Sequence, residues 1–182
     1  MQDYTINMFQ IPLSHYVVRD WEFKKQKLLS LIEQSKFSID KTVKTTYDVT
    51  GNSKTSELNQ LFNNIFNEEI NLFMNTSGLN YYEIELSWFQ IEDCSMSHLV
   101  HNHGYGISAI CYIEFDYEEH IPVHFLSPFN DILTGNSNHY VPEVYEGSII
   151  FFPSFVNHYT IPNPSKKQRK IASFNLKIDK EL

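Results

Sequence analysis

With 182 residues, the chain has the length of one ordinary domain, and such a chain buries roughly 70% of the surface that its unfolded form exposes. Hydrophobic residues make up 42% of it and aromatic residues 15%, which excludes a disordered polar polypeptide. The formal net charge of −8 disfavours nucleic acid as a partner, because an acidic surface repels a phosphate backbone.

Cysteine content and hydropathy indicate the compartment. Cys94 and Cys111 are the only cysteines in the sequence, too few for the disulfide framework of a small secreted domain. No basic and then apolar signal segment opens the sequence, and no run of about 18 apolar residues could cross a membrane. We therefore expect a cytoplasmic protein without a membrane-spanning segment.

The first half of the chain reads as two amphipathic helices. Apolar residues recur near helical spacing over 20–35, and they follow steps of three and four over 56–74, where Gly78 supplies a stop signal. The polar segment 42–54 between these helices has room for one short strand, at 47–49.

From residue 81 onward the pattern changes to short β-prone runs separated by Gly, Pro and Asn. The predicted strands are 82–91, 106–117, 122–126, 139–144, 148–152, 157–161 and 168–178. Helices that precede many short strands indicate an α+β, mainly β domain in which the helices buttress an antiparallel sandwich or barrel. Without a repeat or a low-complexity linker, we expect a single domain over 1–182, with helices at about 20–76 and a β core at about 81–178.

Two histidines are placed to share one ion. In an extended segment alternate side chains point to the same face, so His101 and His103 can converge while Asn102 points away. Such a pair is a weak signal in a chain with eight histidines, because most histidines are hydrogen-bonded or solvent-exposed.

A third ligand strengthens the case, and His158 is the best candidate. It follows a glycine turn at 147, an apolar strand at 148–152 and a Pro-Ser corner, which would deliver it onto a neighbouring strand. The histidines at 15, 120, 124 and 139 are weaker candidates.

Several features occur together in one order over about half of the chain. They are His101-Asn102-His103, the strand at 108–113, the stretch at 142–154, and then His158, Arg169 and the triplet at 173–175. In this series the chain resembles the iron(II)- and 2-oxoglutarate-dependent oxygenases of bacteria and phages, a branch related to prolyl hydroxylases. The N-terminal helices match only in general character.

The resemblance implies a double-stranded β-helix, a jelly roll like that of cupins, with iron at its open end. The implied ligands are His101, His103 and His158, and the implied cosubstrates are 2-oxoglutarate and molecular oxygen. His103 departs from the carboxylate that is commonest at its position. A third neutral imidazole leaves the site one negative charge short, so 2-oxoglutarate or neighbouring groups must balance the charge of the iron.

The same resemblance implies residues for the cosubstrate. Arg169 lies 11 residues after His158, at the family's spacing for the arginine that pairs with the distal carboxylate of 2-oxoglutarate. A planar guanidinium can make two charge-assisted bonds to one carboxylate. Ser173 and Tyr112 are further candidate donors, although Tyr112 could equally be an aromatic residue that only packs.

The reaction that follows is decarboxylation of 2-oxoglutarate to succinate, coupled to hydroxylation of a small-molecule or peptidyl substrate that the sequence does not specify. Two alternatives stay open. A cupin-type dioxygenase with three histidines would oxidise its substrate without 2-oxoglutarate, and an inactive β-helix would serve as a binding module. We also expect the polar loop 127–138 to cover the site as a lid.

Overall fold

The computed structural model describes residues 10–40, 42–47 and 52–179. In chain order the elements are β1 (Ser14–Val17), α1 (Trp21–Gln34), β2 (Ser38–Asp40), β3 (Val43–Thr45), α2 (Asn52–Ser77), β4 (Tyr81–Glu92), β5 (Ile107–Glu114), β6 (His124–Asn130), β7 (Ser137–Tyr140), β8 (Ser148–Pro153), β9 (His158–Tyr159) and β10 (Arg169–Asp179). The α+β order of the prediction is confirmed.

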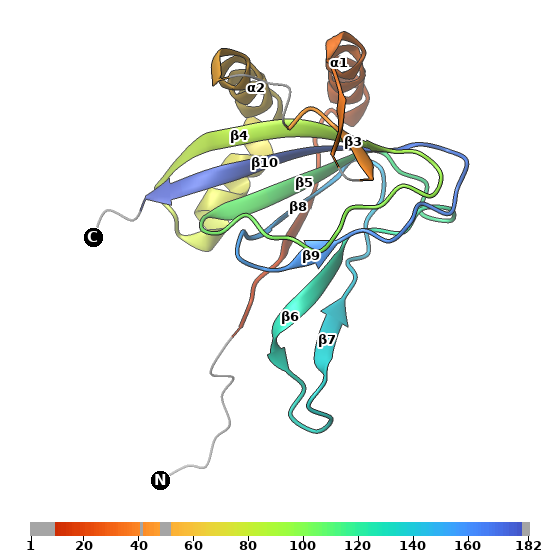
Figure 1. The fold of residues 1–182 in the computed structure, drawn as a ribbon. Coiled ribbons are helices and arrows are strands. Elements are labelled where there is room, and N and C mark those ends of the chain that lie inside the picture. The colour runs from red at the N-terminus through yellow and green to blue at the C-terminus, as the bar shows by residue number, and fades with distance from the viewer. Residues whose placement is uncertain (1–9, 41, 48–51, 180–182) are drawn as a thin grey trace.

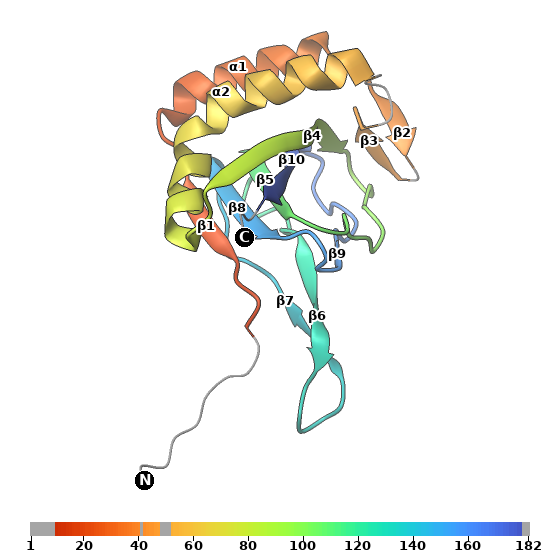
Figure 2. The ribbon, with the colours of Figure 1, turned by 90° about the vertical axis from the view of Figure 1, so that its left-hand side faces the viewer.

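The strands form two antiparallel sheets. Seven strands make the large sheet, in the order β1-β8-β5-β10-β4-β3-β2, and three make the small sheet, in the order β7-β6-β9. Both helices lie on one side of the large sheet and the small sheet lies on its other side, while Figure 2 shows α1 and α2 running side by side (Figures 1 and 2). This arrangement confirms the predicted double-stranded β-helix buttressed by N-terminal helices.

Alternation along the central strands divides the interior into two cores. One set of side chains packs under the helices, and these are Ala109, Cys111, Ile149, Phe151, Ala172 and Phe174. The neighbouring positions face the space between the sheets, and these are Ile110, Tyr112, Ile150, Phe152 and Ile171. Because successive side chains on a strand point to opposite faces, each of β5, β8 and β10 serves both cores. The inner face is the one that can carry a site.

Helix α2 attaches to the large sheet through aromatic rings. Phe62 lies 5.1 Å from Phe89 of β4 between ring centroids, and Phe66 stacks on Phe174 of β10 at 5.6 Å. All four rings are fully buried, and each buried aromatic side chain contributes roughly 1.5–3 kcal/mol through the hydrophobic effect. The helix ends at Ser77, and the next residue, Gly78, has a φ of +66°, the left-handed conformation expected of a glycine after a helix C-terminus.

The N-terminal strands differ from the prediction. The prediction of a strand at 47–49 is wrong at Tyr47, which lies in a turn. Residues 48 and 49 lie outside the described residues. The strand instead occupies β3 and pairs with β2 and β4. Strand β1 was not foreseen either, and it extends the large sheet by pairing with β8. Both β1 and β3 are very short, so they carry almost no periodic signal.

The loop expected to form a lid belongs to a hairpin. Strands β6 and β7 pair through Asn130 and Ser137, and the hairpin projects away from the large sheet (Figures 1 and 2). In its turn, the Asp131 carboxylate accepts the backbone N–H groups of Leu133 and Thr134 at 3.0 and 2.8 Å. No described residue of 127–138 lines the cavity that holds the histidines. In this structure, therefore, the loop does not cover that cavity.

Neither described helix is both long and apolar enough to cross a membrane.

Candidate metal centre

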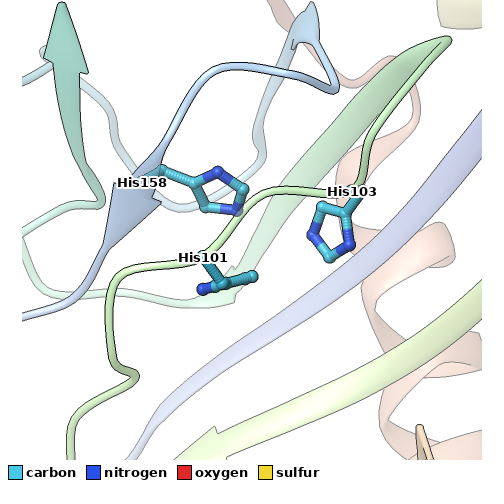
Figure 3. A group of neighbouring side chains, drawn as sticks. All are labelled: His101, His103 and His158. Carbon is cyan, nitrogen blue, oxygen red and sulfur yellow. The ribbon is translucent and has the colours of Figure 1, made fainter.

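Three histidines from two separate segments meet at one point. One nitrogen each of His101, His103 and His158 lies within 4.8 Å of the others, and they form the only such group of potential ligands among the described residues. Figure 3 shows the three rings around a common space, with His158 coming from β9 and the other two from the segment that precedes β5. The structure thus brings together the three histidines that the sequence analysis selects as candidate ligands.

Backbone pairing fixes this convergence. The N–H of His101 donates to the carbonyl of His158 at 3.0 Å, and the reverse bond measures 2.9 Å. The N–H of His103 donates to the carbonyl of Ser154 at 2.9 Å. The 101–103 segment therefore runs antiparallel to residues 154–158, which places two histidines that are 57 residues apart in sequence opposite each other.

Hydrogen bonds select the nitrogen that each ring presents. Nδ1 of His101 lies 2.7 Å from the carbonyl of Leu99, and Nδ1 of His158 lies 2.9 Å from the carbonyl of Val156. A carbonyl only accepts, so each Nδ1 carries the proton and leaves the lone pair on Nε2. Fixing the tautomer in this way is the usual support for a metal-binding imidazole.

Burial keeps two of the imidazoles neutral. Desolvation, followed by the charge of His101, lowers the pKa of His158 to about 3 and that of His103 to about 4. Both rings therefore lack the extra proton at pH 7 and have a lone pair for a cation. The donor set fits a divalent transition metal such as iron(II).

The histidines line a cavity between the two sheets. Its walls come from β4, β5, β8, β9 and β10, and besides the three histidines they include Trp88, Gln90, His98, Ser108, Tyr112, Thr160, Arg169 and Ser173. The ring of Trp88 lies 5.3 Å from that of His103, and the ring of His98 lies 4.0 Å from that of His101. The sequence analysis did not single out His98, because only its place in the fold reveals this contact.

Arg169 reaches the cavity from the first residue of β10. Its side chain is 3% exposed, and on the same strand face it is followed by Ile171 and Ser173, which also line the cavity. Its Nη2 donates to the carboxylate of Glu92, and its Nη1 donates to the carbonyl of Ile121. Arg169 is thus buried in the cavity that the histidines line, and it already has an acidic partner.

Tyr112 and Ser173, the two further candidates for binding the cosubstrate, are buried and line the same cavity. The hydroxyl oxygen of Tyr112 accepts the N–H of Val123 at 3.4 Å, and burial raises the pKa of Tyr112 well above its usual value. Its proton is therefore retained and can be donated. Ser173 is 3% exposed and borders the same cavity.

Glu92 is the charged residue that the sequence reasoning missed. It ends β4 directly opposite Arg169, which begins β10, and it is 1% exposed. Only the strand register reveals this pairing, because 77 residues separate the two side chains in sequence.

The other histidines mostly have structural partners. Nδ1 of His120 accepts the N–H of Asp116 at 3.0 Å, and its Nε2 donates to the carbonyl of Lys167 at 3.1 Å. His15 bonds Ser148 at 2.9 Å and His139 bonds the hydroxyl of Tyr159 at 3.1 Å. His124 differs, because its buried Nε2 has no partner among the described residues.

Several solved structures share this fold. The non-haem α-ketoglutarate-dependent carbocyclase SnoK of nogalamycin biosynthesis has a TM-score of 0.65 at 13% identity, covering 92% of this chain and 80% of its own. HygX of Streptomyces hygroscopicus, solved with nickel, 2-oxoglutarate and hygromycin B, has a TM-score of 0.65 at 8% identity, covering 90% and 82%. The viral collagen prolyl hydroxylase of Paramecium Bursaria Chlorella virus-1, solved with 2-oxoglutarate, has a TM-score of 0.58 at 13% identity, covering 92% and 96%.

No curated protein matches the sequence. A family model does match, and it covers residues 86–175, the part of the chain that contains His101, His103, His158 and Arg169. Its description is "Putative 2OG-Fe(II) oxygenase". Through this domain, the chain is a member of the 2OG-Fe(II) oxygenase family.

Proposed function

We propose that this protein couples decarboxylation of 2-oxoglutarate to hydroxylation of a second substrate, with His101, His103 and His158 as the iron ligands. The observation that carries the proposal is that one cavity contains both three convergent imidazoles and a buried arginine. A site that binds only a metal ion does not need a buried arginine beside the imidazoles, whereas a site that binds a metal ion and a dicarboxylate needs the imidazoles and the arginine.

The imidazoles hold the metal through neutral nitrogens. Carbonyl bonds orient two of the rings, and burial keeps His103 and His158 deprotonated. Because the protein supplies three ligands, other coordination positions remain for cosubstrate and oxygen. When bound, iron(II) supplies the redox chemistry that joins oxygen activation to loss of carbon dioxide.

The remaining cavity residues bind and orient the cosubstrate. Arg169 uses two of its five N–H groups on Glu92 and Ile121, which leaves three for the distal carboxylate of 2-oxoglutarate. The hydroxyl of Tyr112 can donate to the same carboxylate, and Ser173 offers a second hydroxyl from the strand that carries Arg169. Apolar side chains such as Val123, Phe152 and Ile171 exclude water around them.

Of the two rival functions, the three-histidine dioxygenase keeps the metal site, and the binding module keeps only the fold. Neither needs Arg169 to bind a cosubstrate. A three-histidine dioxygenase that works without 2-oxoglutarate has no need of a carboxylate clamp. A binding module without metal has no need of tautomer-fixed, neutral imidazoles. The described residues hold both features in one cavity, which favours the first proposal.

Compartment and substrate belong to the proposal as well. We place the protein in the cytoplasm, supported by two cysteines that are both free, Cys94 exposed and Cys111 buried. The second substrate is a small molecule or a peptidyl group, and the acidic chain disfavours nucleic acid.

Uncoupled turnover tests the activity without knowledge of the second substrate. Under air, with iron(II) and ascorbate, the wild-type protein should convert 2-oxoglutarate slowly to succinate, and His158→Ala should not exceed a metal-free control. Absence of succinate from wild-type protein that holds iron would favour the three-histidine dioxygenase. Wild-type protein that binds no metal would favour the binding module.

A further inference from the structure

The proposed ligand set carries no negative charge. Three neutral imidazoles bind the cation, and among the described residues no carboxylate joins their group. With a divalent metal, the 2-oxoglutarate dianion and the Arg169 guanidinium in place, the cavity would hold one excess positive charge. Uncompensated charge is costly in a site shielded from water.

Glu92 is a buried carboxylate in the right place to compensate. One oxygen, Oε2, accepts from the guanidinium of Arg169. The other, Oε1, accepts from Nε2 of Gln90 at 2.7 Å and from the hydroxyl of Thr160 at 2.8 Å. Three donors thus hold a carboxylate that is only 1% exposed. Such donors on both oxygens are the usual partners of a carboxylate that is buried inside a protein.

Thr160 connects this carboxylate to the metal-binding segments. It lies two residues after His158, and its N–H donates to the carbonyl of His98 at 3.0 Å. Its hydroxyl oxygen also accepts the N–H of His98 at 2.7 Å. Both Thr160 and Gln90 line the cavity, so Glu92 lies one side chain behind the cavity wall.

We propose that Glu92 is a positioning residue that supplies the negative charge missing from the ligand set and holds Arg169 toward the cosubstrate. This inference rests on the proposed function. Glu92 touches neither the metal nor 2-oxoglutarate, and it acts through Arg169 and through the electric field of the cavity. With Glu92 present, the loaded cavity is electrically neutral.

The negative charge of Glu92 should affect the affinity for the metal and the affinity for 2-oxoglutarate in opposite directions. A nearby negative charge attracts the divalent cation and repels the dianion. Replacing Glu92 with glutamine removes the charge and preserves the shape, and the amide oxygen can still accept from Arg169. Gln90 can turn its own amide to match, so the hydrogen bonds can be kept.

Isothermal titration calorimetry on Glu92→Gln tests the inference. Manganese affinity should fall about 3-fold or more, and 2-oxoglutarate affinity of the manganese-saturated protein, measured without oxygen, should rise about 3-fold or more. Glu114→Gln is the matched control, because Glu114 pairs with Lys170 next to Arg169 on β10 but does not line the cavity. It should change neither affinity.

A second pair of variants keeps the test decisive if Glu92→Gln does not fold. Arg169→Gln removes the positive charge, and Arg169→Gln combined with Glu92→Gln replaces the buried ion pair by two neutral amides, so that neither charge is left buried without its partner. Manganese should bind the double variant about 3-fold or more weakly than it binds Arg169→Gln. The double variant should bind manganese like the wild type, because the net charge of its cavity is unchanged.

The outcomes separate this inference from the proposed function. Manganese and 2-oxoglutarate affinities that stay unchanged in Glu92→Gln, or that move in the same direction, would overturn the role of Glu92 and leave the proposed function standing. Equal manganese affinities for Arg169→Gln and the double variant would overturn it too. Wild-type protein that binds neither manganese nor 2-oxoglutarate would instead overturn the proposed function.

Discussion

His158 is the proposed ligand that depends most on tertiary structure, because it reaches the site only through the pairing of β9 with the segment that carries the other two. Replacing it with alanine removes one of three donors. The wild-type apo protein should bind one manganese ion per chain, and His158→Ala should weaken binding about 100-fold or more. Calorimetry measures both. His15→Ala is the control, since that ring bonds Ser148 outside the cavity, and equal affinity for His158→Ala and wild type would remove His158 from the site.

Arg169 is the residue that separates 2-oxoglutarate chemistry from its nearest rival. Truncation to alanine would leave the distal carboxylate without its partner in a buried site, which typically costs about 2–5 kcal/mol. Affinity of the manganese-loaded protein for 2-oxoglutarate should therefore fall about 30-fold or more. Arg169→Lys should recover only part of the loss, because an ammonium keeps the charge without the planar fork.

Lys170→Ala provides the control for general basicity in this titration. Lys170 is the next residue on β10, and it pairs with Glu114 outside the cavity at 2.8 Å. Its removal should leave 2-oxoglutarate affinity unchanged. A similar loss in Lys170→Ala and Arg169→Ala would indicate a diffuse charge effect in place of a clamp.

Among the elements, the turn between the histidines and β5 depends on glycine for two different reasons. Gly104 has a φ of +78° with open space where a Cβ would lie. Gly106 has a φ of +93°, and a Cβ there would lie 2.4 Å from the carbonyl oxygen of Leu176 on β10. Gly104→Ala should cost about 1 kcal/mol of unfolding free energy, from strain alone.

Gly106→Ala should cost more, about 3 kcal/mol or above, since the backbone of β10 must also move. Urea denaturation of both apo variants compares the two costs. Equal stabilities would mean that the close approach of this turn to β10 does not constrain the fold.

The central strands were predictable because their alternation is strong. Ile110, Tyr112 and Ile150 face the inner core while their neighbours face the helices, and this pattern is visible in the sequence. The β6–β7 hairpin was harder to predict. Strand β6 extends to Asn130, beyond the predicted strand at 122–126, and β7 covers Ser137–Tyr140 in place of the predicted 139–144. Exposed hairpin residues carry little hydrophobic pattern.

The residues of the candidate site were also predictable only in part. His101 and His103 follow from period-two geometry, and His158 follows from the glycine turn, strand and Pro-Ser corner before it, whereas Arg169 needed the family resemblance to select it from a basic run. Glu92 could not be found, because nothing local marks it. Its role depends on the register of β4 against β10, which places it opposite Arg169.

At the scale of the whole molecule, the buried imidazoles link stability to pH. In the folded apo protein the pKa of His103 is lowered to about 4 and that of His158 to about 3, from the usual 6.5. Below pH 6.5 the unfolded chain therefore takes up protons that the folded protein does not, so stability falls as pH falls. The slope should approach about 1.4 kcal/mol per pH unit for each such histidine.

Urea unfolding of the metal-free protein between pH 7 and pH 5 measures this slope. His158→Gln should show a shallower dependence, because it removes one of the two groups. A stability that stays constant from pH 7 to pH 5 would contradict the burial of neutral imidazoles in the apo protein.

A crystal structure of the protein with manganese and the 2-oxoglutarate analogue N-oxalylglycine, from crystals grown without oxygen, would test the proposed site most directly. We expect manganese on one nitrogen each of His101, His103 and His158, and the distal carboxylate of the analogue on the guanidinium of Arg169. Manganese bound by other side chains, or an analogue whose distal carboxylate does not contact Arg169, would contradict the proposed site.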